Sequence, residues 1–399
     1  PKTKIILASS YAKTANYWKY YIGQTEQLIK NNVFEKKTDL ESRFVNWVSK
    51  DEKRKSEYGE TLSLLKEYYS GSDSTVKNRV YLVEALITGS SSALFAYRAL
   101  GGLERALENP AMLEKIRPRI LEGAKAHFSE FHAECDRDLM ATLFKMYSNK
   151  ISKYQQPDFL KKVKETHSSF EAYANRIYET SIFMSEDRFM SFLLNPDSSA
   201  LADDPLVQIA KDFRKSYFGS INEELSSKKE KGYRLLTKGL REMLPNEDWS
   251  PDANSTMRMT YGSIGSYEPK DGVTYDYYTT LSGVMEKEDE TNPEFFVPKK
   301  LKELYQNKDY GQYADKNGDL PVGLISNNDI TGGNSGSPLI NAKGELIGVA
   351  FDGNWEAMSG DIFFEDQIQR TISVDIRYVL FIVDKYAGAK HLIDEMVLN

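Results

Sequence analysis

Residues 331–340 read Thr-Gly-Gly-Asn-Ser-Gly-Ser-Pro-Leu-Ile, and residues 344–350 follow as Gly-Glu-Leu-Ile-Gly-Val-Ala. The glycines on both sides of Ser335 allow a sharp turn that projects its Oγ outward while nearby backbone N–H groups converge. A serine nucleophile needs this geometry, because converging N–H groups stabilise the oxyanion that forms on the attacked carbonyl. Pro338 suits the start of the next strand, where no ladder donor is required. The stretch therefore predicts a nucleophile loop that leads into a strand.

The same stretch predicts a β-hairpin. A strand at 337–340 enters the turn Asn-Ala-Lys-Gly at 341–344, and a second strand runs from Glu345 to Asp352. Gly344 suits the positive φ angle that such turns require. We expect the N–H groups of Gly333 and Ser335 to form an oxyanion hole, in which one donor is worth about 3–4 kcal/mol of barrier. For an isolated motif of this kind, the alternative is a plain Gly/Ser turn between two strands.

Upstream of this hairpin, the chain has helical periodicity from about residue 10 to 245, and its 399 residues favour two domains. Asp204 and Pro205 are a typical N-cap and first-turn proline, and they precede apolar positions on one helix face: Leu206, Ile209, Ala210, Phe213 and Tyr217. Asn109 and Pro110 begin another helix, which Pro118 is expected to kink or divide. Prolines and short polar residues at 244–252 predict the domain boundary.

Beyond that boundary, residues 257–262, 273–280 and 320–325 are short, β-branched or aromatic segments separated by Gly-rich turns. They predict a small β-barrel or sandwich, after which residues 375–392 return to helical spacing. The predicted fold class is thus α+β, with an α-helical domain at 1–250 and an antiparallel β-domain at 251–399.

Composition excludes several classes of function. The net charge is −7 and the basic residues form no stripe, so we expect no nucleic-acid partner. No run of 18 apolar residues exists, so we expect no membrane span. Cys135 is the single cysteine, which rules out an intrachain disulfide. The start has neither a methionine nor a signal-peptide pattern, and we read the chain as part of a longer product.

Three further patterns could indicate a ligand or metal site but are better explained by ordinary structure. His127 and His132 are five residues apart and point to different sides of a helix, which argues against a metal site. Residues 315–319 mimic the start of a calcium loop but lack its later ligands, which indicates a turn. The aromatic cluster at 17–21 favours packing under the helical domain over stacking on a ligand. We expect neither a metal nor a cofactor.

Residues 331–340 and 344–350 together resemble the end of the chymotrypsin-like serine peptidases in order and spacing. Adding 351–361, 374–381 and the N-terminal stretch 8–19, the chain resembles the bacterial dipeptidyl-peptidase 7 and 11 family, nearest to the dipeptidyl-peptidase 7 type. The match corresponds to roughly the C-terminal half of a member. The resemblance implies two catalytic barrels with a helical domain between them, so that this chain holds the α-helical cap and the second chymotrypsin-like barrel.

The resemblance also implies that part of the catalytic triad lies elsewhere. In that fold the histidine and the aspartate precede the serine and lie in the first barrel. None of the four histidines, His127, His132, His167 and His391, lies in a setting typical of the triad base. An N-terminal barrel of the same protein is therefore expected to supply both residues.

Carried onto this chain, the resemblance makes Ser335 the nucleophile and has Asp352 and Asn16 hold the substrate's α-ammonium group. A carboxylate at a strand end can hold a cation by a charge-assisted hydrogen bond, although Asp352 could also be a solvated acid and Asn16 an ordinary helix residue. Gly353 implies an apolar S1 pocket, because the acid-specific branch has arginine there. Asp329, six residues before Ser335, sits where trypsin-like enzymes bind basic side chains, but family members that do not cut after basic residues share it.

We therefore predict a serine-type dipeptidyl aminopeptidase that releases N-terminal dipeptides and prefers a bulky hydrophobic residue at the second (P1) position. The alternatives are a chymotrypsin-like endopeptidase and a catalytically inactive peptide-binding module. Expected partners are oligopeptides with a free N-terminus and a second copy of the protein in a homodimer. The family implies the periplasm or cell surface of a Gram-negative bacterium.

Overall fold

The computed structural model describes residues 2–247, 249, 254–292 and 294–398. The chain divides into two compact units. Pro1–Ser10 and Arg43–Trp249 form one, here called the helical unit, and Tyr11–Ser42 with Ser250–Asn399 form the other, the mixed unit. The division at residue 249 agrees with the predicted boundary. Residues 11–42, however, group with the mixed unit although the sequence placed them in the helical domain, because their side chains contact residues beyond 265.

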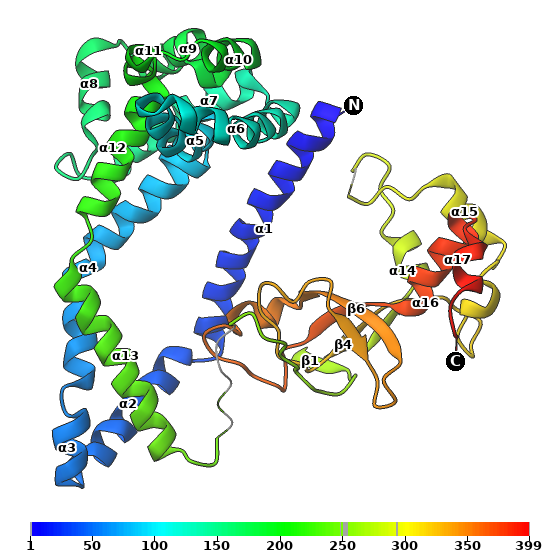
Figure 1. The fold of residues 1–399 in the computed structure, drawn as a ribbon. Coiled ribbons are helices and arrows are strands. Elements are labelled where there is room, and N and C mark those ends of the chain that lie inside the picture. The colour runs from blue at the N-terminus through cyan, green and yellow to red at the C-terminus, as the bar shows by residue number, and fades with distance from the viewer. Residues whose placement is uncertain (1, 248, 250–253, 293, 399) are drawn as a thin grey trace. The chain divides into compact units, whose positions relative to one another are not determined.

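Helices α4 and α13 run side by side (Figure 1). The helices before the boundary form one large core from residues 82–213 and a smaller one around Phe44, Val48 and Tyr58. Their bounds are α1 Lys2–Lys30, α2 Val33–Ser49, α3 Glu52–Tyr58, α4 Thr61–Tyr81, η1 Leu82–Thr88, α5 Ser91–Glu108, α6 Pro110–Glu130, α7 Ala133–Lys150, α8 Asp158–Thr166, α9 Phe170–Thr180, η2 Ile182–Met184, α10 Glu186–Leu194, α11 Ser198–Asp203, α12 Pro205–Gly219 and α13 Glu223–Met243.

Helix α12 confirms its prediction. The Asp204 carboxylate caps it by accepting hydrogen bonds from the backbone N–H groups of Leu206 at 2.8 Å and Val207 at 3.3 Å. Its predicted core positions Leu206, Ile209, Ala210 and Phe213 are buried. Local capping and the apolar stripe therefore agree with the tertiary structure.

Helix α6 differs from its prediction. Asn109 caps it as expected, accepting from the N–H of Ala111 at 3.1 Å, but the helix continues through Pro118 without division. Pro118 and Glu114 lie on the exposed side of the helix. Water can therefore satisfy the Glu114 carbonyl that loses its partner at Pro118.

The strands of the mixed unit form an open antiparallel sheet in the order β3-β4-β7-β6-β5, beside the separate hairpin β1-β2. Their bounds are β1 Tyr267–Lys270, β2 Val273–Tyr275, β3 Tyr278–Thr280, β4 Pro321–Ser326, β5 Pro338–Ile340, β6 Leu346–Gly353 and β7 Thr371–Asp375. The described strands do not close into a barrel, so the chymotrypsin-like barrel stays a prediction.

Short helices gather at one end of this sheet (Figure 1). They are α14 Leu281–Glu286, α15 Lys299–Gln306, η3 Gly311–Tyr313, α16 Ile376–Phe381, η5 Ile382–Tyr386 and α17 Lys390–Asp394, while η4 Trp355–Ser359 follows β6 directly. Leu281, Leu301, Tyr313 and Phe381 form the centre of their core. The predicted return to helix after residue 375 is confirmed.

The strand predicted at 257–262 is absent. Met257, Met259 and Tyr261 in this segment are strongly exposed. Backbone pairing with β4 begins only at Ser263, whose carbonyl accepts from Asn327 N at 3.1 Å. The apolar and β-branched residues upstream have no described strand to pair with, so their propensity alone produces no strand.

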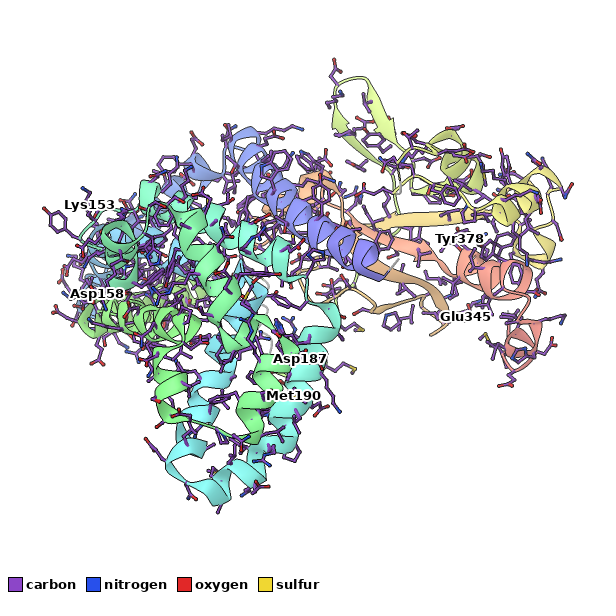
Figure 2. All side chains as sticks on the ribbon, turned by 90° about the horizontal axis from the view of Figure 1, so that it is seen from above. Lys153, Asp158, Asp187, Met190, Glu345 and Tyr378 are labelled. Atoms are coloured by element: carbon purple, nitrogen blue, oxygen red, sulfur yellow. The ribbon has the colours of Figure 1, made fainter. Side chains whose placement is uncertain are left out.

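The predicted hairpin is confirmed. Strands β5 and β6 pair Leu339 with Gly348, and Gly344 has a φ angle of 82°. Figure 2 shows Glu345 at the turn between them, where its carbonyl accepts from Asn341 N at 3.0 Å. The segment 315–319 is likewise a turn, with Gly318 at a φ angle of 81°.

Over the described residues, no single helix is both long and apolar enough to cross a membrane. One sharply bent pair, 52–88 with 91–108, passes that test by length and composition.

Candidate active site

The loop around Ser335 is held by its own backbone. Gly333 and Gly336 have φ angles of 110° and 87°, a region that strains any residue with a Cβ. Asn334 closes the loop from both ends, because its N–H donates to Thr331 O at 3.2 Å and its carbonyl accepts from Ser337 N at 2.9 Å. Both glycines are therefore needed for the turn that the sequence predicted.

Two backbone hydrogen bonds fasten this loop to β6. Gly336 N donates to Ala350 O at 2.8 Å, and Ala350 N donates to Ser337 O at 3.0 Å. The pairing of β6 with β7 is irregular between Ala350 and Asp352, which takes Phe351 out of the ladder. The freed Phe351 carbonyl accepts a hydrogen bond from Ser335 Oγ at 3.1 Å.

Ser335 is exposed at the tip of this loop. Within the described residues, neither its backbone N–H nor that of Gly333 donates to a protein group. Two donors beside an exposed hydroxyl are therefore available to an incoming carbonyl oxygen, as an oxyanion hole requires.

Asp352 follows Phe351 directly in β6. The contact between Ser335 and the Phe351 carbonyl therefore places Asp352 close to Ser335. Its side chain is exposed, and its Oδ1 accepts from Gly353 N at 2.8 Å. The remaining lone pairs of the carboxylate face solvent, where they can receive a cation.

Gly353 ends β6, and its φ angle lies outside the left-handed region. A Cβ added there would lie 3.0 Å from the Cβ of Ala357 in η4. The backbone therefore does not demand glycine at this position. The close methyl group of Ala357 is the feature that favours the absence of a side chain.

Asn16 lies exposed on α1, within the residues that group with the mixed unit. In the described structure, no hydrogen bond joins it to Ser335 or Asp352. It precedes Tyr20 by one helical turn, so the two share a face of α1. Tyr20 contacts the part of the mixed unit that lies after β6, because its hydroxyl donates to Asp361 Oδ2 at 3.0 Å.

Sequence reasoning missed Asp361 and its link to Asp329. Partial burial, followed by the negative charge of Asp361, raises the pKa of Asp329 above its ordinary value. Burial and then the hydrogen bond to Asp361 raise the pKa of Tyr20. The prediction that the aromatic cluster at 17–21 packs under the helical domain is wrong, because Tyr17, Trp18 and Tyr21 are exposed. Only Tyr20 is partly buried, and its partner Asp361 belongs to the mixed unit.

None of the four histidines hydrogen-bonds to Ser335 in the part of the chain that the structure describes. His127, His132 and His167 belong to the helical unit, and His391 lies on α17. The His127 ring stacks on Phe95 with 4.4 Å between centroids, and burial lowers its pKa to about 4. It is a packed aromatic side chain, whereas the sequence favoured a solvated helix face here.

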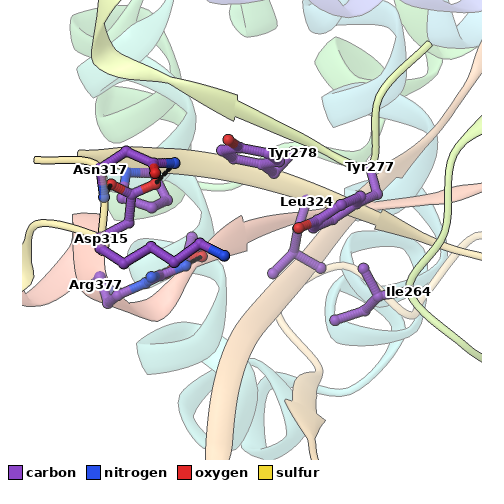
Figure 3. Close-up of a pocket in the computed structure, with 10 residues that line it drawn as sticks. Ile264, Tyr277, Tyr278, Asp315, Asn317, Leu324 and Arg377 are labelled. Atoms are coloured by element: carbon purple, nitrogen blue, oxygen red, sulfur yellow. Dashed lines mark hydrogen bonds and ion pairs between the residues drawn. The ribbon is translucent and has the colours of Figure 1, made fainter. Parts of the chain in front are cut away.

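A pocket of about 380 Å³ lies elsewhere in the mixed unit (Figure 3). Its lining contains a bidentate ion pair, in which Arg377 donates to Asp375 through Nε at 2.9 Å and Nη2 at 2.7 Å. It includes none of the predicted site residues, so the candidate active site does not rest on it. Searching the described residues for three or more clustered His, Cys, Asp or Glu side chains gives no group that could hold a metal ion.

Known proteins match this chain over nearly its whole length. A model of the peptidase S46 family matches residues 1–398. Dipeptidyl-peptidase 7 of Phocaeicola vulgatus is 42% identical over 405 residues, which cover 100% of this chain and 56% of that protein. The Asp/Glu-specific dipeptidyl-peptidase of Flavobacterium psychrophilum is 37% identical over 404 residues, covering 99% and 55%.

Among solved structures, Porphyromonas endodontalis DPP11 in complex with the dipeptide Arg-Glu superposes with a TM-score of 0.86 at 34% identity. The match covers 99% of this chain and 57% of that one. The chain thus spans about half the length of the curated relatives it matches.

Proposed function

The chain belongs to the peptidase S46 family, and on that premise we propose that it carries the nucleophile of a serine-type dipeptidyl-peptidase. The observation that carries the proposal is the loop at Ser335, where an exposed hydroxyl lies beside two N–H groups that have no acceptor among the described residues. Ser335 attacks the peptide carbonyl, and the N–H groups of Gly333 and Ser335 bind the oxygen as it becomes negative.

Cleavage after two residues requires a group that measures distance from the substrate's N-terminus. Asp352 has this role in our proposal, and Asn16 assists it. Two extended residues span about 7 Å. Asp352 is adjacent in sequence to Phe351, whose carbonyl lies 3.1 Å from Ser335 Oγ, so its carboxylate is on the scale of a dipeptide from the nucleophile.

The general base and its orienting carboxylate come from outside this chain in our proposal. We assign them to an N-terminal barrel of the same protein. In this proposal, the open sheet of the present chain is part of the second chymotrypsin-like barrel, which packs against that first one. The relatives' greater length supports this assignment. We further propose a periplasmic or cell-surface location and a homodimer, which cell fractionation and analytical ultracentrifugation of the full-length protein would test.

The P1 preference in our proposal is for bulky hydrophobic side chains. Gly353 supports it, because this position presents no cation to neutralise an acidic side chain. The higher identity to a dipeptidyl-peptidase 7 than to an Asp/Glu-specific relative points the same way. The DPP11 complex with Arg-Glu favours the opposite, acidic preference, which makes this the part of the proposal most worth testing.

Activity is tested with the full-length protein on paired peptides that have free or acetylated N-termini. We expect dipeptide release from the free form, strong loss on acetylation and no release by Ser335→Ala. Equal cleavage of both forms would instead support an endopeptidase. Peptide binding without cleavage would support the inactive binding module.

The P1 preference is tested with Gly353→Arg. We expect kcat/KM to fall by about 10- to 100-fold for peptides with Leu, Met or Phe at the second position and to fall less, or rise, for Glu and Asp. Gly353→Ala is the matched control, because it adds only the Cβ that approaches Ala357. The pocket assignment fails if arginine lowers cleavage of both substrate classes to the same extent.

A further inference from the structure

Within the mixed unit, helix α1 contacts the segment after β6 along one stripe of side chains. Tyr20 donates to Asp361 at 3.0 Å, and Glu26 Oε2 accepts from Trp355 Nε1 at 3.3 Å. Between them, Gly23 is buried. Because these positions are three residues apart, they lie on one face of the helix. The residues that they contact are Trp355 and Met358 in η4 and Asp361 just after it.

The approach at Gly23 is the tightest of these contacts. A Cβ added there would lie 2.8 Å from Met358 Cγ and 3.2 Å from Trp355 Cζ2, closer than such atoms normally come. Glycine is a weak helix former, and Gly23 lies well inside a 29-residue helix. The close approach of η4 provides a physical reason for glycine at this position.

The following residues extend the contact. Lys30 Nζ donates to Pro269 O at 2.9 Å, and Lys36 pairs with Glu365 while lying 4.6 Å from the centre of the Phe363 ring. Residues 20–36 are therefore attached to the rest of the mixed unit at several points, both before and after the break between α1 and α2.

Segment η4 is in turn tied to the end of β6. Asn354 is buried, and its Oδ1 accepts from Ala357 N at 3.1 Å and from Arg370 N at 2.9 Å. Ala357 is the residue whose Cβ faces the empty side of Gly353. A shift of Met358 or Trp355 would therefore move Ala357 with it and change the space beside Gly353.

We propose that α1 sets the size of the S1 pocket by holding η4 in place. Tyr20, Gly23 and Glu26 are then positioning residues for the substrate's second side chain. This inference rests on the proposed dipeptidyl-peptidase function and deepens it. None of the three residues needs to touch the substrate, because they act through Met358, Trp355 and Asp361 on Ala357.

The test uses Gly23→Ala in the full-length protein, with Gly123→Ala as the matched control. Both glycines lie inside helices, but an added Cβ at Gly123 meets nothing within 4 Å. We expect Gly23→Ala to lower kcat/KM about 10-fold for peptides with Phe at the second position, mainly through KM, and at most 2-fold for peptides with Ala there. Gly123→Ala should leave kcat/KM unchanged for both peptides.

Rescue distinguishes positioning from general damage. Met358→Ala removes Cγ, the nearest of the atoms that the new methyl group would meet. The double variant Gly23→Ala/Met358→Ala should therefore recover most of the lost preference for Phe over Ala. Tyr20→Phe removes the hydrogen bond to Asp361 and the one that the hydroxyl accepts from Gln24. It should lower the Phe-to-Ala ratio by about 3-fold.

An unchanged Phe-to-Ala ratio in an active Gly23→Ala protein, or an equal loss on both peptides, overturns this inference. Failure of the wild-type protein to release any dipeptide overturns the proposed function itself. The two failures are therefore distinguishable.

Discussion

Asp136 in the helical unit and Asp352 in the mixed unit are carboxylates with opposite surroundings. Asp136 is only 5% exposed and accepts hydrogen bonds from Ser90 Oγ, from Ser91 N at 2.6 Å and from the backbone and hydroxyl of Ser92. Asp352 is exposed and, among described residues, accepts only from Gly353 N. A carboxylate whose lone pairs are used by its own fold stabilises that fold, whereas one left open can bind a ligand.

The same contrast separates larger regions. Around η1, α5 and α12, side chains such as Leu86, Leu100 and Leu206 are fully buried. The buried polar groups of Ser90, Ser92 and Asp136 hydrogen-bond to one another. At the loop around Ser335, this residue is exposed, and among the described residues the N–H groups of Gly333 and Ser335 have no protein acceptor. Substitutions in the first region should therefore change stability, and substitutions in the second should change activity.

The largest expected effect is that of Ser335→Ala. Peptide cleavage by the full-length protein should fall by at least about 10⁴-fold, because no nucleophile remains. The free energy of unfolding should stay within about 0.5 kcal/mol, since the side chain is exposed and makes one hydrogen bond. Single-turnover kinetics and urea unfolding measure the two quantities. A destabilised variant would break the contrast.

Asp352→Asn should have the next largest effect. Loss of the charge removes a charge-assisted hydrogen bond to the substrate's ammonium group, and kcat/KM for peptides with free N-termini should fall about 100-fold. Residual cleavage of N-acetylated peptides should not change. If both peptide forms lose activity alike, Asp352 does not recognise the amine.

Asp136→Ala should act on stability alone. The substitution removes the acceptor of the Ser90 hydroxyl and of the N–H and hydroxyl groups of Ser91 and Ser92, at a cost of about 3 kcal/mol. Urea unfolding measures this loss, and kcat/KM measured well below the unfolding transition should match that of the wild type. A reduced kcat/KM in the folded variant would contradict the contrast.

The smallest expected effect depends on pH and on His127. Burial holds its pKa near 4 in the folded chain, against 6.5 when unfolded. The unfolded chain therefore binds a proton first, so stability is fully present above pH 6.5 and is lost as pH falls toward 4. Between pH 7 and pH 4.5, protonation of His127 in the unfolded chain should lower the free energy of unfolding by roughly 2 kcal/mol.

His127→Phe preserves the stacking on Phe95 without a titrating group. Urea unfolding of the variant should show roughly 2 kcal/mol less destabilisation on acidification than the wild type. Identical pH profiles for the two proteins would show that the buried ring is not the group responsible.

Most features determined by the sequence alone depend on neighbours along the chain. The hairpin at β5 and β6 forms because Gly344 can adopt a positive φ angle, and α12 begins where the Asp204 carboxylate can cap it. The left-handed glycines at 333 and 336 shape the nucleophile loop in the same local way. Each of these interactions spans only a few residues, so a short pattern suffices to predict it.

Only the tertiary structure decided the features that depend on distant partners. Residues 257–262 have strand-forming side chains but no described strand beside them, and α6 continues through Pro118 because that side of the helix faces water. Residues 11–42 look helical and belong with the mixed unit, since Tyr20 finds Asp361 341 positions away. No local pattern encodes such contacts, because their free energy comes from surfaces that meet only when the chain has folded.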